Sequence, residues 1–486
     1  MVGLAGGKIE LGRSVTIKRE YDAVVVGSGP NGLAAAIVLA QAGKSVLVLE
    51  AQEQIGGGTR SQALTLPGFT HDVCSAVHPM AVASPFFRTL PLGEHGLEWI
   101  YPRYSLAHPL DDSTAVILER SLEQTAEALG GDANVYQCLV GSLAADWSLL
   151  EHDILSPVGF PQRPVEMARF GLRAVQPAAR LARAHFKTEA ARALFAGLAA
   201  HSTMPLDSWG TAAIGLVLGA LAHVRGWPIA KGGSQRIADA LASYLRSLGG
   251  EIVTGARVRS RKELPASRLT LCDVSPRGLL EIAGDDFPAA YRRALERYEY
   301  GPAVFKVDWA LCGSIPWKAP ECAKAGTVHI GGSFEEIVDA ERGLLGKDVA
   351  ERPFVLLSQP SMFDATRAPA GNHTAWAYCH VPSGSETDMA GRIEAQVERF
   401  APGFRNLILA RSTRSPAQME QNNANLVGGN ITGGANSLRQ LFLRPTMNQY
   451  ETPVKGLFLC SASTPPGGGV HGMCGYHAAT KAQASI

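Results

Sequence analysis

The stretch from Tyr21 to Ser61 constrains the fold of this chain more than any other part of the sequence. Its apolar, β-branched run from Ala23 to Val26 predicts a buried parallel strand. The strand leads into the glycine pattern G-x-G-x-x-G at 27–32, and the alanine-rich segment from Leu33 to Ala42 predicts a helix. A second buried strand is predicted at 45–49. This order predicts a β–α–β unit of the dinucleotide-binding kind.

Each glycine of the pattern stands where a side chain would obstruct a bound dinucleotide. Gly27 makes the tight turn, Gly29 lets the backbone approach a pyrophosphate at the positive helix N-terminus, and Gly32 lets the helix pack close to the strand. Glu50, at the end of the second strand, would accept hydrogen bonds from ribose hydroxyls. The predicted binding residues are Gly27, Ser28, Gly29, Asn31, Gly32 and Glu50. The alternative is a glycine turn between core elements that binds no ligand.

A second glycine-rich turn, IGGGTRS at 55–61, directly follows the second strand. It resembles the second phosphate-contacting motif of the glutathione-reductase-like FAD superfamily, which simple NAD dehydrogenases lack. Gly57 and Gly58 allow close approach of the backbone, and Thr59 lies beside them. The Arg60 guanidinium offers donors suited to phosphate or flavin oxygens, although it could also be an ordinary surface cation. The motif predicts FAD as the cofactor.

Charge and hydropathy argue against two classes of protein. The formal net charge is +1 at pH 7, which gives no electrostatic reason to propose a nucleic-acid partner. No stretch reaches the roughly 18 consecutive apolar residues of a membrane span, and the run Ala212–Val224 predicts a buried helix. The eight cysteines include no C-x-x-C pair, so we expect neither a metal site nor a disulfide framework. We expect a cytoplasmic protein, at most peripheral to a membrane.

The region from Leu122 to Val224 predicts a mostly helical domain, interrupted at several prolines. Within it, the segment 167–192 is rich in Ala, Leu and Phe with arginines interspersed. A basic amphipathic helix of this kind could lie on an anionic membrane surface. The alternative is a substrate-domain helix with one solvated cationic face.

The pattern of a nucleotide-binding domain returns after the helical region. An amphipathic helix at 235–248 precedes two predicted strands, at 251–253 and 256–258. In FAD flavoproteins that this segment resembles, the residue matching Val258 pairs with adenine through its backbone. The strand predicted at 269–273 resembles the one that closes over the cofactor.

The nucleotide-binding domain is therefore discontinuous in the sequence, because the substrate domain is inserted into it twice. We predict an α/β fold: a Rossmann-like, glutathione-reductase-like FAD-binding domain with an inserted mixed α+β substrate domain. The FAD-binding parts are predicted at 20–96, 227–301 and 426–486. The substrate-domain parts are predicted at 97–226, mostly helical, and at 302–425, a sheet with helices.

A second strand, glycine loop and helix lie near the C-terminal end. A buried strand is predicted at 455–460, and a loop at 461–472 leads into a helix from Met473 to Ala484. In FAD enzymes the positive end of such a helix points at the flavin pyrimidine edge and stabilises the reduced ring. The predicted flavin-contacting residues are Ser461, Gly469, Val470 and His471.

A strand with strict alternation is predicted at 302–309. Phe305 and Trp309 lie on one face, and Lys306 and Asp308 lie on the other. The strand resembles the one that carries a flavin-proximal lysine in flavin amine oxidases, which makes Lys306 a catalytic candidate. The alternative is a solvated lysine on a polar face.

Taken together, residues 20–484 resemble the phytoene dehydrogenase-related family of FAD-dependent oxidoreductases. Within that family the chain looks closest to the branch of pyridine nucleotide-disulfide oxidoreductase domain-containing protein 2. The resemblance is carried by VVVGSGPNGLAAA, IGGGTRS, GTVHIGGSFEEI, SQPSMFDATRAPAGNH, NLVGGNITGG and LCSASTPPGGGVHGMCGYHAA. It implies FAD buried between two domains and an apolar channel that reaches the flavin.

We therefore expect an FAD-dependent dehydrogenase or desaturase of a hydrophobic, carotenoid- or lipid-like substrate. Flavin N5 can accept the hydride, and Lys306 and His471 are the candidates that manage the accompanying proton; the alternative for His471 is packing beside the loop. Three other functions stay open: a flavin amine-type oxidase, a flavin-dependent double-bond isomerase, and an interaction protein in which FAD is structural. The expected partner is a hydrophobic small molecule, and peripheral membrane contact and a homodimer also stay open.

Overall fold

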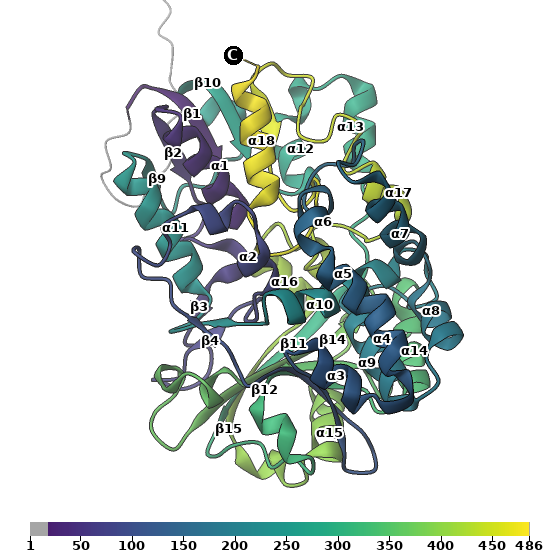
Figure 1. Ribbon diagram of the computed structural model, residues 1–486. Helices are drawn as coiled ribbons and strands as arrows, with labels where there is room; N and C mark the ends of the chain where they lie inside the picture. The colour runs from purple at the N-terminus through teal and green to yellow at the C-terminus, as the bar shows by residue number, and fades with distance from the viewer. Residues whose placement is uncertain (1–17, 486) are drawn as a thin grey trace, which may run out of the picture.

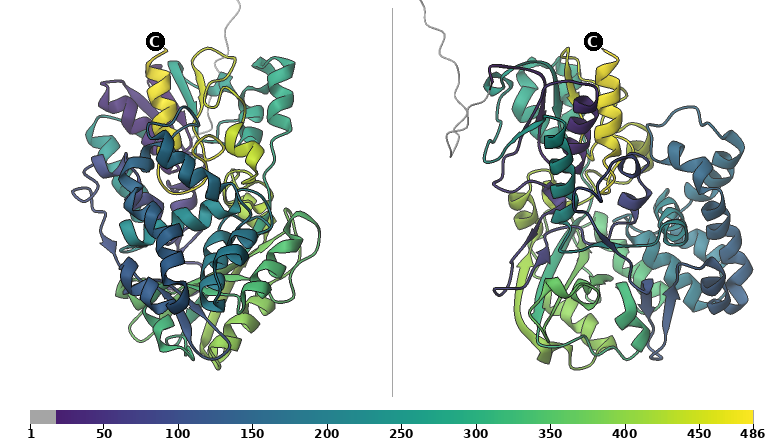
Figure 2. Two further views of the ribbon diagram at one scale, coloured as in Figure 1. Left: turned by 45° about the vertical axis from the view of Figure 1, so that its right-hand side comes forward. Right: turned by 60° about the vertical axis from the view of Figure 1, so that its left-hand side comes forward.

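The computed structural model describes residues 18–485, and the chain forms two sheets with a layer of helices beside them (Figures 1 and 2). A five-stranded sheet lies at one end and a seven-stranded sheet at the other. Most of the helices between residues 122 and 224 stand together at the side of both sheets. The sequence predicts a leader of little consequence to the fold at residues 1–20; its first 17 residues lie outside the described residues, and Glu20 is the first residue of a strand.

The five-stranded sheet is entirely parallel, and its first strand lies in the middle. Its strands, in spatial order, are β16 (Leu457–Leu459), β10 (Ala266–Cys272), β1 (Glu20–Val26), β2 (Val46–Leu49) and β9 (Glu251–Val253). Ala23 and Val25 pack into one apolar cluster and Val24 and Val26 into another, so both faces of β1 are covered. This double burial explains the unbroken apolar run in the sequence.

The helices that cover this sheet come from distant parts of the chain. They are α1 (Pro30–Gln41), α11 (Gln235–Ser247) and α18 (Met473–Gln483), with α12 (Pro276–Ala283) and α13 (Ala289–Glu296) on the opposite side. Helix α1 begins at Pro30, three residues before the predicted start, because proline fits the first turn of a helix and Gly29 takes the position before it. The expected α1–sheet packing is confirmed, whereas the predicted strand at 256–258 is wrong: β9 ends at Val253 and an irregular segment follows.

The seven-stranded sheet contains both parallel and antiparallel pairs, and its strands come from two parts of the chain, 104–118 and 303–414. In spatial order it contains β15 (Ile408–Arg414), β11 (Ala303–Leu311), β14 (His373–Val381), β13 (Val355–Ser358), β12 (Ala325–Ile330), β6 (Tyr104–Pro109) and β7 (Ala115–Leu118). One face packs against α15 (Ala390–Phe400) in a core that includes Phe305, Trp309 and Phe404. The predicted alternation of β11 is confirmed, since these residues share a face that excludes Lys306.

The region between the two predicted nucleotide-binding segments is helical, as expected. Its helices are α3 (Leu122–Ala128), α4 (Ala133–Tyr136), α5 (Ser142–Ala145), α6 (Trp147–Ile154), α7 (Pro164–Ala174), α8 (Ala178–His185), α9 (Glu189–Ala200) and α10 (Thr211–Val224). The basic segment 167–192 is not one amphipathic helix, because Pro177 separates α7 from α8. No helix among residues 18–485 has the length and apolar character that a bilayer span requires.

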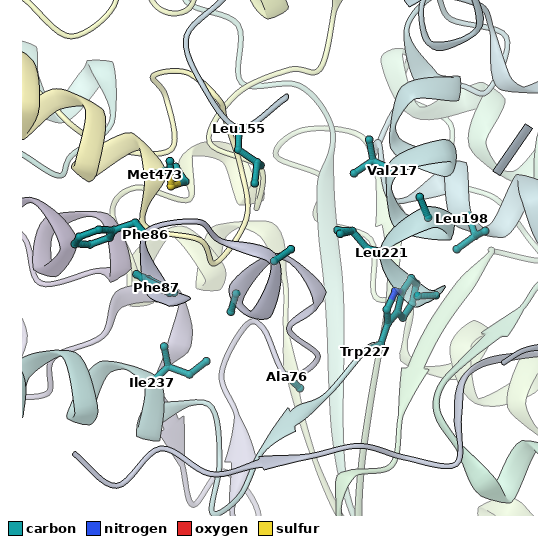
Figure 3. Packing of buried hydrophobic residues seen from close by; sticks show 14 of the residues in the cluster. Ala76, Phe86, Phe87, Leu155, Leu198, Val217, Leu221, Trp227, Ile237 and Met473 are labelled. Atoms are coloured by element: carbon teal, nitrogen blue, oxygen red, sulfur yellow. The ribbon is translucent and has the colours of Figure 1, made fainter. Parts of the chain in front are cut away.

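One continuous apolar cluster joins the first sheet to the helical layer (Figure 3). Met473 and Ile237 belong to α18 and α11, and Val217 and Leu221 belong to α10 on the far side of the same cluster. Trp227 lies next to α10, after its last turn. The three layers are therefore held by a shared core, which fixes the space between them.

Short elements complete the connections between the layers. They are β3 (Ser61–Gln62) paired with β4 (His71–Asp72), β5 (Trp99–Ile100) paired with β8 (Ile229–Ala230), and the helices α2 (Pro79–Ala83), α14 (Phe334–Arg342), α16 (Pro416–Asn422) and α17 (Leu438–Phe442).

Candidate cofactor and substrate site

A cavity of about 1220 Å³ lies where the two sheets and the helical layer meet. Its lining includes nearly all of the predicted cofactor residues: Gly27, Ser28, Gly29, Asn31, Glu50, Gly57, Gly58, Thr59, Arg60, Val258, Ser461, Gly469, Val470 and His471. Gly32 and Lys306 are not part of the lining. The structure thus gathers residues that the sequence separates by more than 400 positions around one space.

The first glycine turn leaves no room for side chains. Gly27 has φ +102°, a left-handed conformation that glycine adopts without strain. A Cβ on Gly29 would lie 2.6 Å from the Asp273 carboxylate, and one on Gly32 would overlap the carbonyl oxygen of Gly27. Gly32 therefore acts behind the cavity, where it allows α1 to pack on β1, as its predicted role requires.

The Glu50 carboxylate is fixed by the same turn. It accepts hydrogen bonds from the Ser28 backbone N–H at 2.9 Å and from the Ser28 hydroxyl at 2.5 Å. Its other oxygen accepts from the Gln52 N–H at 2.9 Å, and the Glu50 carbonyl accepts from the Ala256 N–H at 2.8 Å. The last contact holds the irregular segment that brings Val258 to the cavity wall.

Asp273 is a buried acid in this turn that the sequence analysis did not select. Its carboxylate accepts the Gly32 N–H at 2.9 Å. The pKa of Asp273 is raised to about 7, mainly by burial. The charge of Glu50 contributes to the rise, and the N–H groups of Gly32 and Gly29 oppose it. Its position at the end of β10, beside β1, was the available signal, because carboxyl ends of parallel strands meet at one edge.

The Arg60 side chain is buried, so the alternative interpretation as an ordinary surface cation is wrong. Its Nε donates to the Gly57 carbonyl at 2.9 Å, and one terminal nitrogen donates to both the carbonyl and the side-chain oxygen of Asn422, at 2.8 and 2.7 Å. These bonds tie the second glycine turn to the end of α16. Burial lowers the pKa of Arg60, while the charge of Glu50 raises it.

The C-terminal loop delivers a second helix N-terminus to the cavity. His471 is buried, and its Nδ1 accepts the Met473 backbone N–H at 3.0 Å, which satisfies the first donor of α18. Burial lowers the pKa of His471 to about 4, against the carbonyls of Gly467 and Gly468, so the ring is neutral near pH 7. The imidazole therefore holds the loop onto the helix while it lines the cavity.

Lys306 is buried, so the alternative interpretation, a solvated lysine on a polar face, is wrong. Its side chain is 1% exposed, its Nζ lies 2.5 Å from Asp308, and it stands 5.2 Å from the centre of the Trp376 ring. Burial lowers the pKa of Lys306, and Asp308 opposes the shift. Trp376 lines the cavity, whereas Lys306 does not.

The comparisons with known proteins show what this chain is similar to. A model of an NAD(P)-binding Rossmann-like domain matches residues 25–90. Pyridine nucleotide-disulfide oxidoreductase domain-containing protein 2 of Rattus norvegicus is 26% identical, over 97% of this chain and 95% of the rat protein. The 4,4'-diapolycopen-4-al dehydrogenase of Metabacillus indicus is 24% identical, over 92% of this chain and 93% of the enzyme.

The chain is an oxidoreductase, similar over nearly its whole length to the two proteins just described. The structure of a putrescine oxidase bound to putrescine has the same fold, with a TM-score of 0.63, 19% identity and coverage of 96% of this chain and 99% of that chain. The predicted α/β fold class is thereby confirmed.

The half of the oxidoreductase cavity that faces away from the glycine turns is mainly apolar. Its walls come from the helical layer and from the seven-stranded sheet: Leu155, Met167, Phe170, Val175, Ile214, Val217, Trp227, Leu356, Trp376 and Tyr378. None of these residues was predicted from the sequence. Only the alternation of β14, which sets Trp376, Tyr378 and His380 on one face, could have indicated them.

Proposed function

We propose that this oxidoreductase is an FAD-dependent dehydrogenase or desaturase of a hydrophobic, carotenoid- or lipid-like molecule. The observation that carries the proposal is the continuity of the cavity. One space runs from the glycine turns that suit a dinucleotide to a chamber lined by apolar side chains. Large apolar pockets with few polar groups bind apolar ligands.

The residues at the glycine end fit FAD. Helix α1 meets the cavity at its N-terminus, where the N-cap residue Gly29 supplies no side-chain cap and the Gly32 N–H is bound by Asp273. The positive end of the helix dipole would favour a pyrophosphate there. The side-chain oxygen of Asn31, beside that helix end, is buried and has no hydrogen-bond partner among residues 18–485. Glu50 lies at the end of β2, where it could accept ribose hydroxyls, and Val258 lines the same wall. The second helix end, at α18, would face the ring of the cofactor.

Bound FAD would supply a two-electron acceptor for a hydride taken from a substrate C–H bond. The apolar walls would exclude water and orient the chain of the substrate along the cavity. We assign His471 a positioning role, because its Nδ1 is engaged by Met473 and its neutral ring fixes the loop beside the flavin site. Lys306 would act through Trp376, whose ring centre lies 5.2 Å from its Nζ, with Asp308 compensating its charge.

The mouth of the cavity supports an apolar substrate as well. Phe160 and Phe442 line the cavity and are 91% and 52% exposed. Apolar side chains exposed at a binding site mark the route of an apolar ligand or the surface that delivers it. Peripheral contact with a membrane is part of this proposal, since a membrane would be the source of such a ligand.

An amine-type oxidase is the second candidate, and the burial of Lys306 favours it. The protein shares its fold with a putrescine oxidase, and Lys306 lies on the strand that resembles the lysine strand of flavin amine oxidases. Peroxide released on addition of putrescine would favour this candidate over the first.

The test is an anaerobic titration of the purified protein, followed through the visible absorbance of its bound flavin. We expect FAD to copurify and to bleach when a carotenoid or lipid extract is added. A flavin that stays oxidised with all apolar extracts would contradict the dehydrogenase. A protein that neither carries FAD nor binds it on reconstitution would contradict both candidates.

A further inference from the structure

Two polar side chains in the apolar half of the cavity each have an atom free to bind a ligand. Tyr378 and His201 line the cavity from β14 and from the end of α9. Within residues 18–485, the Tyr378 hydroxyl makes no hydrogen bond and is not sealed from the cavity. The same holds for Nδ1 of His201, whose only hydrogen bond is made by its Nε2.

His201 is held by a second histidine. Its Nε2 lies 3.0 Å from Nε2 of His329, a fully buried residue on β12. Gly197 makes the room for that partner, because a Cβ there would come within 2.7 Å of the His329 ring. Trp227 meets His201 edge to face, with ring centres 5.8 Å apart. These contacts fix the imidazole and leave Nδ1 as its free atom.

Tyr378 is held with comparable rigidity. Its ring stacks on Trp376 with centres 5.7 Å apart and planes 7° apart. On the neighbouring strands Tyr378 pairs with Lys306 on one side and with Leu356 on the other, and Leu356 pairs with His329. One row of the sheet therefore carries the tyrosine and the partner of His201, separated by an apolar residue.

We propose that the Tyr378 hydroxyl and Nδ1 of His201 form a polar subsite that binds the oxygen of an otherwise apolar substrate. The substrate class is then an apolar chain that carries a hydroxyl or carbonyl group, rather than a pure hydrocarbon. This inference rests on the proposed function, whose substrate it narrows. When a hydrocarbon covers two fixed polar groups, they lose their contact with water, and this weakens binding. A substrate oxygen that forms hydrogen bonds with them removes this cost.

The experiment compares the binding of farnesol and farnesene, an isoprenoid alcohol and its hydrocarbon, to the FAD-loaded protein. Binding is followed under anaerobic conditions by tryptophan fluorescence, because Trp227 and Trp376 line the cavity, and by the flavin spectrum. We expect farnesol to bind roughly tenfold more tightly than farnesene, as one net hydrogen bond allows. Equal affinities would overturn the subsite.

Two variants locate the effect. Tyr378→Phe removes only the hydroxyl and should weaken farnesol binding about fivefold to tenfold while farnesene binding stays unchanged. His201→Phe keeps the ring against Trp227 and should act in the same direction. Tyr136→Phe is the control, since Tyr136 donates to or accepts from His223 at 2.7 Å outside the cavity. Unchanged farnesol binding in Tyr378→Phe would overturn the proposal.

Failure of this inference can be distinguished from failure of the proposed function. A flavin that is bound and bleached by apolar extracts, in a protein that binds farnesol and farnesene equally, would retain the dehydrogenase and reject the subsite. A protein without FAD would reject the proposed function itself.

Discussion

Strand β1 lies at the centre of the five-stranded sheet and β11 lies one strand from the edge of the seven-stranded sheet; both are buried, but they bury side chains of different chemistry. Each face of β1 packs into an apolar cluster, through Val25 on one side and Val24 on the other. Strand β11 packs Trp309 into an apolar cluster on one side and buries Lys306 with Asp308 on the other, each at 1% exposure. The first strand supports a site at its end, whereas the second carries polar residues on its face.

The difference shows that polarity in the sequence does not report exposure. The Lys306 face is covered because the nucleotide-binding segments fold over it: Asp72 of β4 pairs with Arg367 at 2.6 Å, and Arg414 donates to the Val73 carbonyl at 3.1 Å. Charge is thus concentrated in the interface between the two sheets, next to the cavity.

The largest effect expected is at this charged face. Lys306→Met leaves Asp308 buried without its partner and should lower the free energy of unfolding by about 3–5 kcal/mol. Urea denaturation followed by circular dichroism measures the change.

The matched control removes both charges. The double variant Lys306→Met/Asp308→Leu buries no unpaired charge. Most of the stability lost in Lys306→Met should therefore return. If this double variant is stable and its flavin is reduced at the normal rate, the charged face is structural and Lys306 has no role in the reaction.

The tight turn of the first sheet should be almost as sensitive. Gly32→Ala forces a Cβ into the Gly27 carbonyl, so we expect a loss of about 3 kcal/mol of stability and of bound flavin. Gly391→Ala in α15, where the added Cβ meets nothing within 4 Å, is the control and should leave both unchanged. Normal flavin content in Gly32→Ala would contradict the role given to the turn.

Asp273 should make the stability of the cofactor-free protein depend on pH. Its pKa is raised from 3.8 to about 7, so between these values the folded state holds a proton that the unfolded state has lost. Stability should therefore fall by about 2 kcal/mol as the pH rises from about 5.5 to 7. Thermal unfolding across this range should show the fall in the natural protein and little of it in Asp273→Asn; the same slope in both would rule out Asp273 as its source.

The smallest effect on stability is expected at a helix whose N-terminus is capped by its own side chains, in contrast to the helix whose N-terminus lines the cavity. Helix α14 begins with a capping box of Ser333 and Glu336, whereas α1 begins at Gly29 without a side-chain cap. Ser333→Ala should cost about 1 kcal/mol of stability and leave FAD affinity unchanged. A loss of FAD affinity, measured by equilibrium dialysis, would show that the two regions are coupled.

The geometry of the glycine turns could be predicted from the sequence because each role there depends on neighbouring residues. A glycine that must turn or pack closely is recognisable from its neighbours, and so is an acid at a strand end, which is why Gly27, Gly32 and Glu50 lie where they were expected. Asp273 escaped notice because its partner, the Gly32 N–H, is 241 residues away in the chain. Arg60 lies at the cavity wall, but its bonds go to Asn422 at the end of α16, whose position relative to Arg60 no local pattern predicts.

By itself, the sequence determined the β–α–β unit, the family resemblance and the alternation of β11, since periodicity and backbone freedom are properties of neighbouring residues. Only the tertiary structure decided that Lys306 is buried next to Trp376, that the ring of His471 is engaged by α18, and that Tyr378 and His201 face one cavity. Those facts depend on which surfaces meet when distant segments pack, and packing is a property of the whole chain.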